Sequence, residues 1–202
     1  MAKVTKAASI RTLELVMDEF SRSELSPDSL VSYAIPLSVM RVHDNFALLL
    51  PSTAANDDMA IITGTPGTDA PTLQGVDFGG TSTDEKAGFQ FVLPPEYENG
   101  GQIQVVVRAA MLTTVSDGTA TVDVQCWPQD DNGAVSADIC STAAQSINST
   151  TPADKTFTIT PTNRVSGDVL NIRLAFAGSD TGNVGVMIPE ISKVTVKCDI
   201  RG

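Results

Sequence analysis

Short runs in which every second side chain is apolar recur from residue 29 to the end of the chain. Polar and apolar residues alternate in KTFTIT, residues 155–160, and in KVTVKC, residues 193–198. This is the period of a strand with one face on a core and the other in water. Turn-forming residues such as Asn99-Gly100-Gly101 separate the runs. The pattern predicts an all-β chain of about ten short strands.

The predicted strands share alternation or β-branched composition. They are Leu30–Val42, Phe46–Leu50, Met59–Thr63, Gly88–Leu93, Gln102–Val115, Thr119–Trp127, Ala134–Cys140, Thr156–Thr160, Asp168–Ala177, Val184–Ile188 and Ser192–Ile200. Residues 63–83 and 141–154 are rich in small polar residues and are expected to be long loops, the first with one short strand over Leu73–Phe78. Parallel strands would need helices to connect them, and the sequence shows no helical pattern between the predicted strands. We therefore expect a jelly-roll-like antiparallel β-sandwich.

One segment ahead of the strands has the period of a helix. In IRTLELVMDEF, residues 10–20, apolar residues recur three and four apart, after Ser9 at the N-cap position and before Pro27. We divide the chain into an N-terminal arm, 1–28, and a β-sandwich domain, 29–202. The apolar helix face must be buried on the sandwich or on a neighbouring subunit. The candidate contact residues of the arm are Lys3, Lys6, Ile10, Arg11, Leu13, Val16, Met17 and Phe20.

The charge of the chain is negative and unevenly distributed. The net charge is −11, and the stretch from Asp44 to Asp154 holds 15 acidic residues against only Lys86 and Arg108. Such a field repels phosphate backbones, so we expect no nucleic-acid partner. No apolar run approaches the roughly 20 residues that span a bilayer, and the first residues lack a signal-peptide core. We expect a soluble protein, synthesised in a cytoplasm, without a membrane partner.

The residue types that usually carry catalysis are scarce. His43 is the single histidine, and neither a nucleophile elbow nor a phosphate-binding glycine loop occurs. Glu96 and Glu98 have the spacing of a possible glycosidase carboxylate pair. They lie between a Pro-Pro and an Asn-Gly-Gly turn, however, so we expect a loop rather than a strand that would hold them on one face. We predict a protein that is not an enzyme and has no cofactor, with His43 as a solvated or locally hydrogen-bonded group and both glutamates in a solvated loop.

Two acidic pairs, Asp57-Asp58 and Asp130-Asp131, raise the question of calcium, because hard cations prefer clustered oxygen ligands. The second pair lacks the remaining positions of a calcium-binding loop. We predict exposed turns and no metal site.

The three cysteines, Cys126, Cys140 and Cys198, match no metal or redox spacing. We predict buried free thiols; a Cys126–Cys140 disulfide across a hairpin is the alternative, which a reducing cytoplasm disfavours.

The stretch GFQFVLPPEYENGGQIQVVV, residues 88–107, predicts a strand, a Gly-rich turn and a second strand, that is, a hairpin. It resembles a recurring element of small jelly-roll structural proteins of tailed bacteriophages. The residues that carry the resemblance are Phe89, Phe91, Leu93, Pro94, Tyr97, Gly100 or Gly101, Ile103 and Val105. VSGDVLNIRL, residues 165–174, resembles a later strand of the same proteins, and the resemblance covers roughly residues 85–200.

The resemblance implies a virion structural protein, most closely a capsid decoration (cement) protein. Such proteins commonly assemble as trimers on the head shell and stabilise contacts between capsomers. The implied partners are other copies of the chain, as a homotrimer, and the major capsid protein or another virion protein. The implied location is the virion. A tail, neck or fibre-base protein is the first alternative, and a carbohydrate-binding or carbohydrate-cleaving β-sandwich is the second.

Overall fold

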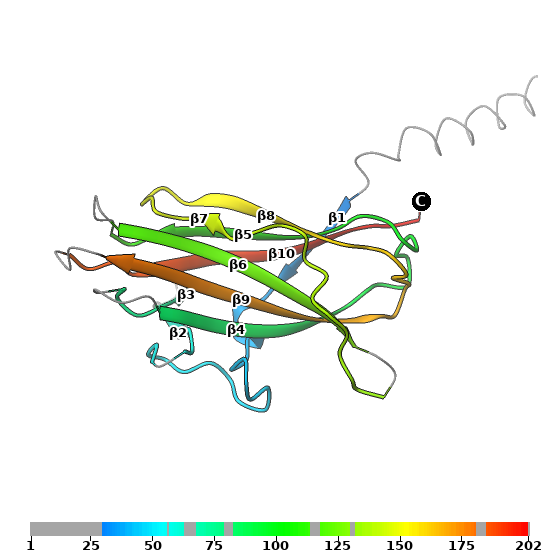
Figure 1. The fold of residues 1–202 in the computed structure, drawn as a ribbon, viewed down its shortest axis with the longest axis horizontal. Coiled ribbons are helices and arrows are strands. Elements are labelled where there is room, and N and C mark those ends of the chain that lie inside the picture. Colours follow the sequence, from blue (N-terminus) through cyan, green and yellow to red (C-terminus); the bar gives the residue numbers. More distant parts are fainter. Residues whose placement is uncertain are drawn as a thin grey trace, which may run out of the picture.

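Two antiparallel sheets pack face to face in the computed structural model (Figure 1). The structure describes residues 30–55, 57–62, 68–78, 83–113, 118–129, 132–180 and 185–201. These residues confirm the predicted jelly-roll-like β-sandwich. The predicted helix and all candidate contact residues from Lys3 to Phe20 lie outside the described residues. The division of the chain at residue 28 stays a prediction.

The strands divide unequally between the sheets. The six-stranded sheet has the order β2 (Ala60–Ile62), β3 (Thr72–Gln74), β10 (Pro189–Asp199), β5 (Ile103–Met111) and β8 (Ala153–Ile159), and β1 (Leu30–Ile35) also pairs with β10. The four-stranded sheet has the order β4 (Thr83–Val92), β9 (Val169–Asp180), β6 (Gly118–Gln129) and β7 (Gln145–Ser146). A 3-10 turn, η1 (Leu37–Val39), follows β1. No helix in the described part of the chain has the length and apolar character needed to cross a membrane.

The core lies between the sheets because the strands alternate. In β6 and β9 every second side chain is buried, as with Val124 and Phe176. The opposing sheet contributes Val105, Phe157 and Val196, which are also fully buried. Side chains from two inner faces interlock in this way in β-sandwiches. On the four-stranded sheet, the outer face is left to side chains such as Gln125 and Arg173, which alternate with the core residues.

Four predicted strands differ from the structure. Residues 185–188 of the predicted strand Val184–Ile188 form no strand, and the Met187 N–H donates to Asp77 Oδ1 at 2.7 Å instead. The first strand ends at Ile35, because Pro36 leads into η1. Residues 46–50 form only one bridge, from Arg41 to Leu49. Residues 134–140 form a loop held by Asp138, whose Oδ1 accepts from the backbone N of Cys126 and of Cys140, both at 2.9 Å. β7 instead falls in the predicted loop 141–154, whereas the short strand predicted over 73–78 is present as β3.

The predicted hairpin over residues 88–107 is wrong. β4 belongs to the four-stranded sheet and β5 to the six-stranded sheet, so the segment between them crosses from one sheet to the other. Tyr97 fixes this crossing: its side chain is fully buried, and its hydroxyl donates to the Gly101 carbonyl at 2.6 Å. Its backbone also bridges to Ile200. The expected Gly-rich turn is present, with Gly100 at φ 77° and the Gly101 N–H donating to the Glu98 carbonyl at 2.7 Å, but it lies in a segment that crosses between the sheets.

Tyr97→Phe is expected to lower the free energy of unfolding by about 1–2 kcal/mol, because the Gly101 carbonyl loses its buried donor while the ring stays in place. Urea unfolding measures the difference. Tyr33→Phe is the matched control, since Tyr33 is half-buried and its ring packs against Phe91 with centroids 5.6 Å apart. Equal losses in the two variants would contradict the importance of the Tyr97 hydroxyl.

The outer edge of β4 is covered by residues 36–55 and 57–59, which we call the edge loop (below β4 in Figure 1). Arg41 and Gly88 exchange two backbone hydrogen bonds of 2.9 Å. Farther along the same edge, the Met59 N–H donates to the Lys86 carbonyl at 3.0 Å, and the Lys86 N–H donates to the Asp57 carbonyl at 2.8 Å. Covering an edge in this way prevents uncontrolled strand pairing. It also fixes the edge loop beside the outer face of the four-stranded sheet.

Candidate interaction surface

The outer face of the four-stranded sheet carries a group of large planar side chains. Strand pairing places them in two rows: Gln90, Asn171 and Trp127 are successive partners across three strands, and Arg173 pairs with Gln125 in the next row. Phe46 of the edge loop joins them at the position of Gly88. We call Phe46, Gln90, Gln125, Trp127, Asn171 and Arg173 the outer-face patch.

Arg173 holds the centre of the outer-face patch. Its guanidinium carbon lies 4.9 Å from the ring centroid of Trp127, a cation–π contact. Its Nε donates to Gln125 Oε1 at 2.8 Å, and a second guanidinium nitrogen donates to the same oxygen. The indole ring of the only tryptophan is therefore half-buried and held in one orientation. A fixed ring loses little conformational entropy when a partner binds.

Amide side chains extend this surface toward β4. Gln90 Nε2 donates to Asn171 Oδ1 at 2.9 Å and lies 3.3 Å from Gln129 Oε1. Asn171 Nδ2 in turn donates to the Trp127 carbonyl at 3.4 Å. Each amide can still donate or accept further hydrogen bonds from the solvent side. The patch thus combines an aromatic face with polar groups in fixed positions.

The edge loop adds exposed apolar surface. Leu48 and Leu49 are 54% and 58% exposed, and Phe46 is 38% exposed. A hollow of about 480 Å³ lies beside them, lined by Val39, Arg41, Phe46, Ala47 and Gln90. Grouped exposed apolar side chains mark sites of association on soluble proteins. The edge loop and the outer-face patch therefore form one candidate surface for a macromolecular partner.

Gly88→Val is expected to displace Phe46 and to cost about 1–3 kcal/mol of stability, because a Cβ at residue 88 would lie 2.5 Å from Phe46 Cε2. Thermal unfolding measures the loss. Gln90→Val places the same side chain on the same face of β4, where the residue is exposed, and should change stability by no more than about 0.5 kcal/mol. A Gly88→Val variant as stable as Gln90→Val would show that the position of the Phe46 ring does not require a glycine at residue 88.

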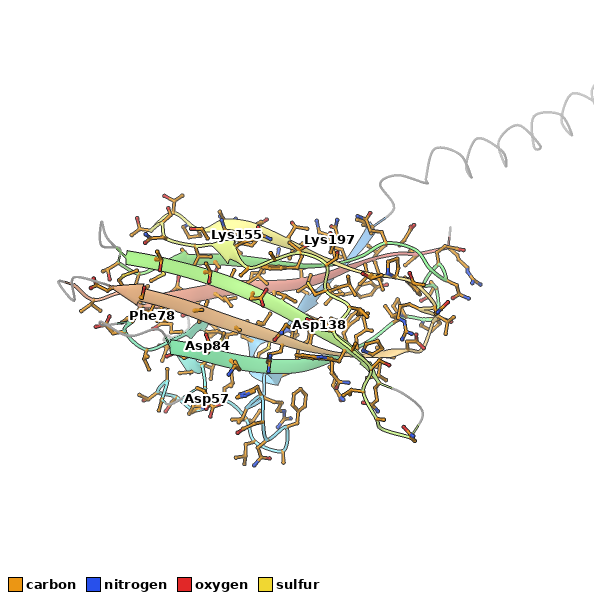
Figure 2. All side chains as sticks on the ribbon, viewed as in Figure 1. Asp57, Phe78, Asp84, Asp138, Lys155 and Lys197 are labelled. Atoms are coloured by element: carbon orange, nitrogen blue, oxygen red, sulfur yellow. The ribbon has the colours of Figure 1, made fainter. Side chains whose placement is uncertain are left out.

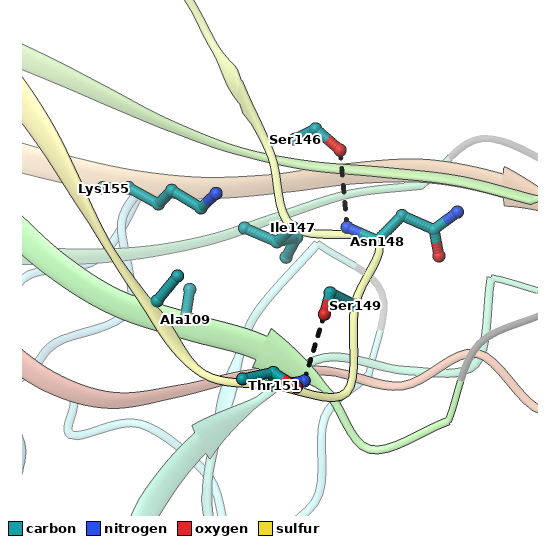
Figure 3. Close-up of a pocket in the computed structure, with 8 residues that line it drawn as sticks. Ala109, Ser146, Ile147, Asn148, Ser149, Thr151 and Lys155 are labelled. Carbon is teal, nitrogen blue, oxygen red and sulfur yellow. Dashed lines mark hydrogen bonds between the residues drawn. The ribbon is translucent and has the colours of Figure 1, made fainter.

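A second hollow, of about 470 Å³, lies between β5, β7 and β8 (Figure 3). It is lined by Ala109, Ser146, Ile147, Asn148, Ser149, Thr151, Ala153 and Lys155. The hydroxyls of its two serines accept hydrogen bonds from nearby backbone groups. Ser146 Oγ accepts from the Asn148 N–H at 3.5 Å, and Ser149 Oγ accepts from the Thr151 N–H at 3.1 Å. No aromatic or acidic side chain is among its lining residues. These groups support the turn and form no reactive arrangement.

The glutamates considered for glycoside hydrolysis are both exposed, on either side of Tyr97. Glu98 Oε2 lies 3.1 Å from Arg201 Nε in an exposed ion pair. Glu96 contributes its backbone carbonyl, which accepts from the Arg201 N–H at 2.7 Å. Tyr97, which separates them, is buried. Both residues therefore act in the connection between the C-terminus and the crossing segment.

The cysteines are free, so the alternative of a Cys126–Cys140 disulfide is not realised. Cys126 and Cys198 are buried, and Cys140 is half-buried. Burial raises the pKa of the Cys126 thiol to about 12 and that of Cys198 to about 11. Such thiols stay protonated near neutral pH and are poor nucleophiles.

The structure brings His43 next to the acidic pair Asp57-Asp58, which the sequence analysis treated apart from it. The imidazole of His43 is only 12% exposed; its Nε2 lies 3.6 Å from Asp57 Oδ2, and its Nδ1 lies 3.7 Å from Asp58 Oδ1. Burial raises the pKa of Asp58, and the carboxylates of Asp57 and Asp44 add to the rise. Asp57 is exposed, as predicted for this pair, whereas Asp58 is half-buried, and the contact of both carboxylates with His43 was not predicted. Asp130 and Asp131 lie outside the described residues.

No protein-family model matches the sequence, and a comparison with curated proteins finds no match. Among solved structures, the chain is similar to the xylan-binding module CBM15, with a TM-score of 0.47 and 13% identity over 86% of this chain and 99% of that one. It is also similar to the CBM36-1 domain of a multidomain xylanase from the hindgut metagenome of Trinervitermes trinervoides, with a TM-score of 0.44 and 12% identity over 85% and 100%. The CBM22-1 xylan-binding domain from Paenibacillus barcinonensis Xyn10C gives 0.41 and 11% over 74% and 86%. We draw no conclusion about family or ligand from likenesses of this size.

Proposed function

We propose that the protein is a structural protein of a tailed-bacteriophage virion, of the capsid decoration (cement) type, which binds the head shell as a homotrimer. One observation carries the proposal: the exposed apolar residues of the edge loop adjoin the outer-face patch, where Arg173 fixes Trp127. Tryptophan and arginine dominate the binding energy of many protein interfaces, and apolar neighbours exclude water around them. This combination suits a permanent contact with another protein.

The sequence resemblance also supports the proposal, and the residues that carry it belong to the core of the fold. Phe89, Phe91, Leu93 and Tyr97, which carry it, are all buried. They therefore maintain the sandwich and its crossing segment, while the contact surface lies elsewhere. In this proposal the N-terminal arm supplies a second contact, with a neighbouring subunit or with the shell. The major capsid protein is the partner, and the protein is located in the virion.

A structural role agrees with the chemistry of the described residues. Their cysteine thiols are protonated, their candidate glutamates are engaged in the C-terminal connection, and their single histidine lies between aspartates. We therefore propose that the protein is not an enzyme. A tail, neck or fibre-base location uses the same kind of surface, and the copy number per particle distinguishes it from a head location.

Light scattering on a sizing column tests the self-association of the full-length chain. We expect a mass three times that of the 21.2 kDa chain. The same measurement on a chain that lacks residues 1–27 shows which contact the arm makes. Loss of the trimer would mean that the arm lies between subunits, whereas a retained trimer would mean that the arm binds the shell. A monomer for the full-length chain at every concentration would contradict the trimer.

Carbohydrate binding is a second candidate, favoured by the amides of Gln90, Gln125 and Asn171 around the Trp127 ring. An apolar ring with a few fixed hydrogen-bonding groups is a common arrangement in small-ligand sites. A glycan array with Trp127→Ala as the paired variant tests it. Binding by the full-length chain that Trp127→Ala abolishes would support this candidate, and absence of binding to any glycan would reject it.

A further inference from the structure

The edge loop places three potential metal ligands next to one another. One ligand atom from each of His43, Asp44 and Asp58 lies within 4.8 Å of the others. His43 and Asp44 belong to the turn after Val42, and Asp58 belongs to the segment that pairs with Lys86 of β4. Asp57 adds a carboxylate oxygen 3.6 Å from the second ring nitrogen of His43. The group lies on the edge of β4, where Figure 2 labels Asp57.

Two of these ligand atoms are buried without a hydrogen bond. Neither His43 Nδ1 nor Asp58 Oδ1 has a hydrogen-bonding partner, although almost no solvent reaches them. They face each other at 3.7 Å, which is too far for a hydrogen bond. Buried polar atoms of native proteins nearly always have a partner, so two that face each other require an explanation. A bound species that accepts a lone pair from each atom provides one.

The separation of the two atoms fits a shared cation. Nitrogen and oxygen ligands lie about 2.0–2.2 Å from Zn²⁺ in tetrahedral sites, so two of them stand about 3.4 Å apart. The observed 3.7 Å requires only a small adjustment. Imidazole nitrogen favours Zn²⁺ and similar transition metals, whereas Ca²⁺ and Mg²⁺ prefer oxygen ligands alone.

We propose that His43, Asp44 and Asp58 bind one divalent transition-metal ion, with Zn²⁺ as the representative. Three protein ligands leave a fourth position for water, and Asp57 lies beside the other ring nitrogen of His43 as an outer-shell partner. The ion neutralises carboxylates that otherwise repel one another. It also joins the turn at residues 43–47 to the segment that covers β4, and so fixes the loop that carries Phe46 and Leu48. The role is structural.

The rival arrangement is a protonated His43 that bridges Asp57 and Asp58 without a metal. The two differ in one measurable respect: only the first makes the thermal midpoint depend on metal concentration. A ligand that binds the folded state alone raises stability with its concentration.

Calorimetric titration of the EDTA-treated, dialysed full-length chain with ZnCl₂, MnCl₂ or CaCl₂ tests the proposal. We expect one Zn²⁺ per chain, a higher thermal midpoint with Zn²⁺, and much weaker binding of Ca²⁺. His43→Gln and Asp58→Asn should each weaken Zn²⁺ binding by more than about tenfold, since loss of an outer-shell partner alone costs about 10–100-fold. Asp154→Asn is the matched control, because Asp154 is an exposed aspartate paired with Arg108 on the other sheet.

The MnCl₂ titration separates this site from the free thiols, since thiolates select softer ions than Mn²⁺. Asp58→Asn keeps the size of the side chain and so serves if His43→Gln does not fold. Absence of Zn²⁺ binding, or binding that neither variant weakens relative to Asp154→Asn, would overturn the proposal. An unchanged thermal midpoint across Zn²⁺ concentrations would do the same and would favour the protonated His43.

Discussion

Phe78→Ala is expected to lower the free energy of unfolding by about 3–5 kcal/mol, a large part of the stability of a small domain. The Phe78 side chain is fully buried at one end of the sandwich (Figure 2). Its ring lies over Gly178, where an added Cβ would come within 2.5 Å of Phe78 Cδ2. Both backbone polar groups of Phe78 are hydrogen-bonded. Its N–H donates to the Met187 carbonyl at 3.0 Å, and its carbonyl accepts from the Asp180 N–H at 3.2 Å. Such a site cannot collapse easily around the cavity that alanine leaves.

Urea unfolding followed by circular dichroism measures the loss, and Phe46→Ala is the matched control. The same atoms are removed there, but from a side chain that is 38% exposed, so we expect a smaller loss, of about 1–2 kcal/mol. If Phe78→Ala costs no more than Phe46→Ala, the Phe78 side chain does not contribute to the core.

Glu85→Gln is expected to stabilise the protein above pH 7 by about 3 kcal/mol and to leave it nearly unchanged below pH 4.5. Glu85 lies on β4, faces the core and is fully buried. Its Oε1 accepts from the Val76 N–H at 2.7 Å, whereas Oε2 has no hydrogen-bonding partner. Burial raises the pKa of this carboxyl from 4.5 to about 7, because the charged form is poorly solvated.

The direction of the pH dependence follows from the two pKa values of Glu85. The folded state keeps the proton up to about pH 7, whereas the unfolded chain releases it near pH 4.5. The folded state therefore binds more protons in this window, and stability falls as the pH rises through it. Each pKa unit corresponds to about 1.36 kcal/mol, which gives the expected 3 kcal/mol above pH 7. Glutamine keeps the acceptor for Val76 but carries no charge.

Urea unfolding at several values between pH 4 and pH 8 measures the difference between the full-length chain and Glu85→Gln. Asp84→Asn removes a neighbouring but exposed carboxyl of the same strand and is the matched control for the loss of a negative charge. A difference for Glu85→Gln that is the same at pH 4 and pH 8 would mean that the native carboxyl is not kept protonated by burial.

The sequence predicted the sandwich where the alternation of side chains was sufficient to define a strand. The predicted strands Thr119–Trp127 and Asp168–Ala177 correspond to β6 and β9 within a few residues. The crossing between β4 and β5 was missed because a hairpin and an inter-sheet connection have the same local pattern. The burial of Tyr97 decides between them, and that depends on tertiary packing.

The candidate surface could be predicted only in part. Alternation places Trp127 on the polar face of its strand, and the same holds for Arg173, but their contact depends on the register between β6 and β9. His43 and Asp58 are distant in sequence and meet only because the edge loop covers β4. The arm, which carried every predicted contact residue, lies outside the described residues. The predicted contacts of the arm stay a prediction, and the outer-face patch is a candidate surface within the described residues.

Co-sedimentation with head shells tests the proposed function most directly. The shells are assembled from the major capsid protein of the genome that encodes this chain, and the purified full-length chain is added at increasing concentration. We predict saturable pelleting that Trp127→Ala weakens by about tenfold or more, and that the exposed control Lys193→Ala on the other sheet leaves unchanged. A full-length chain that stays in the supernatant at every concentration would contradict the account.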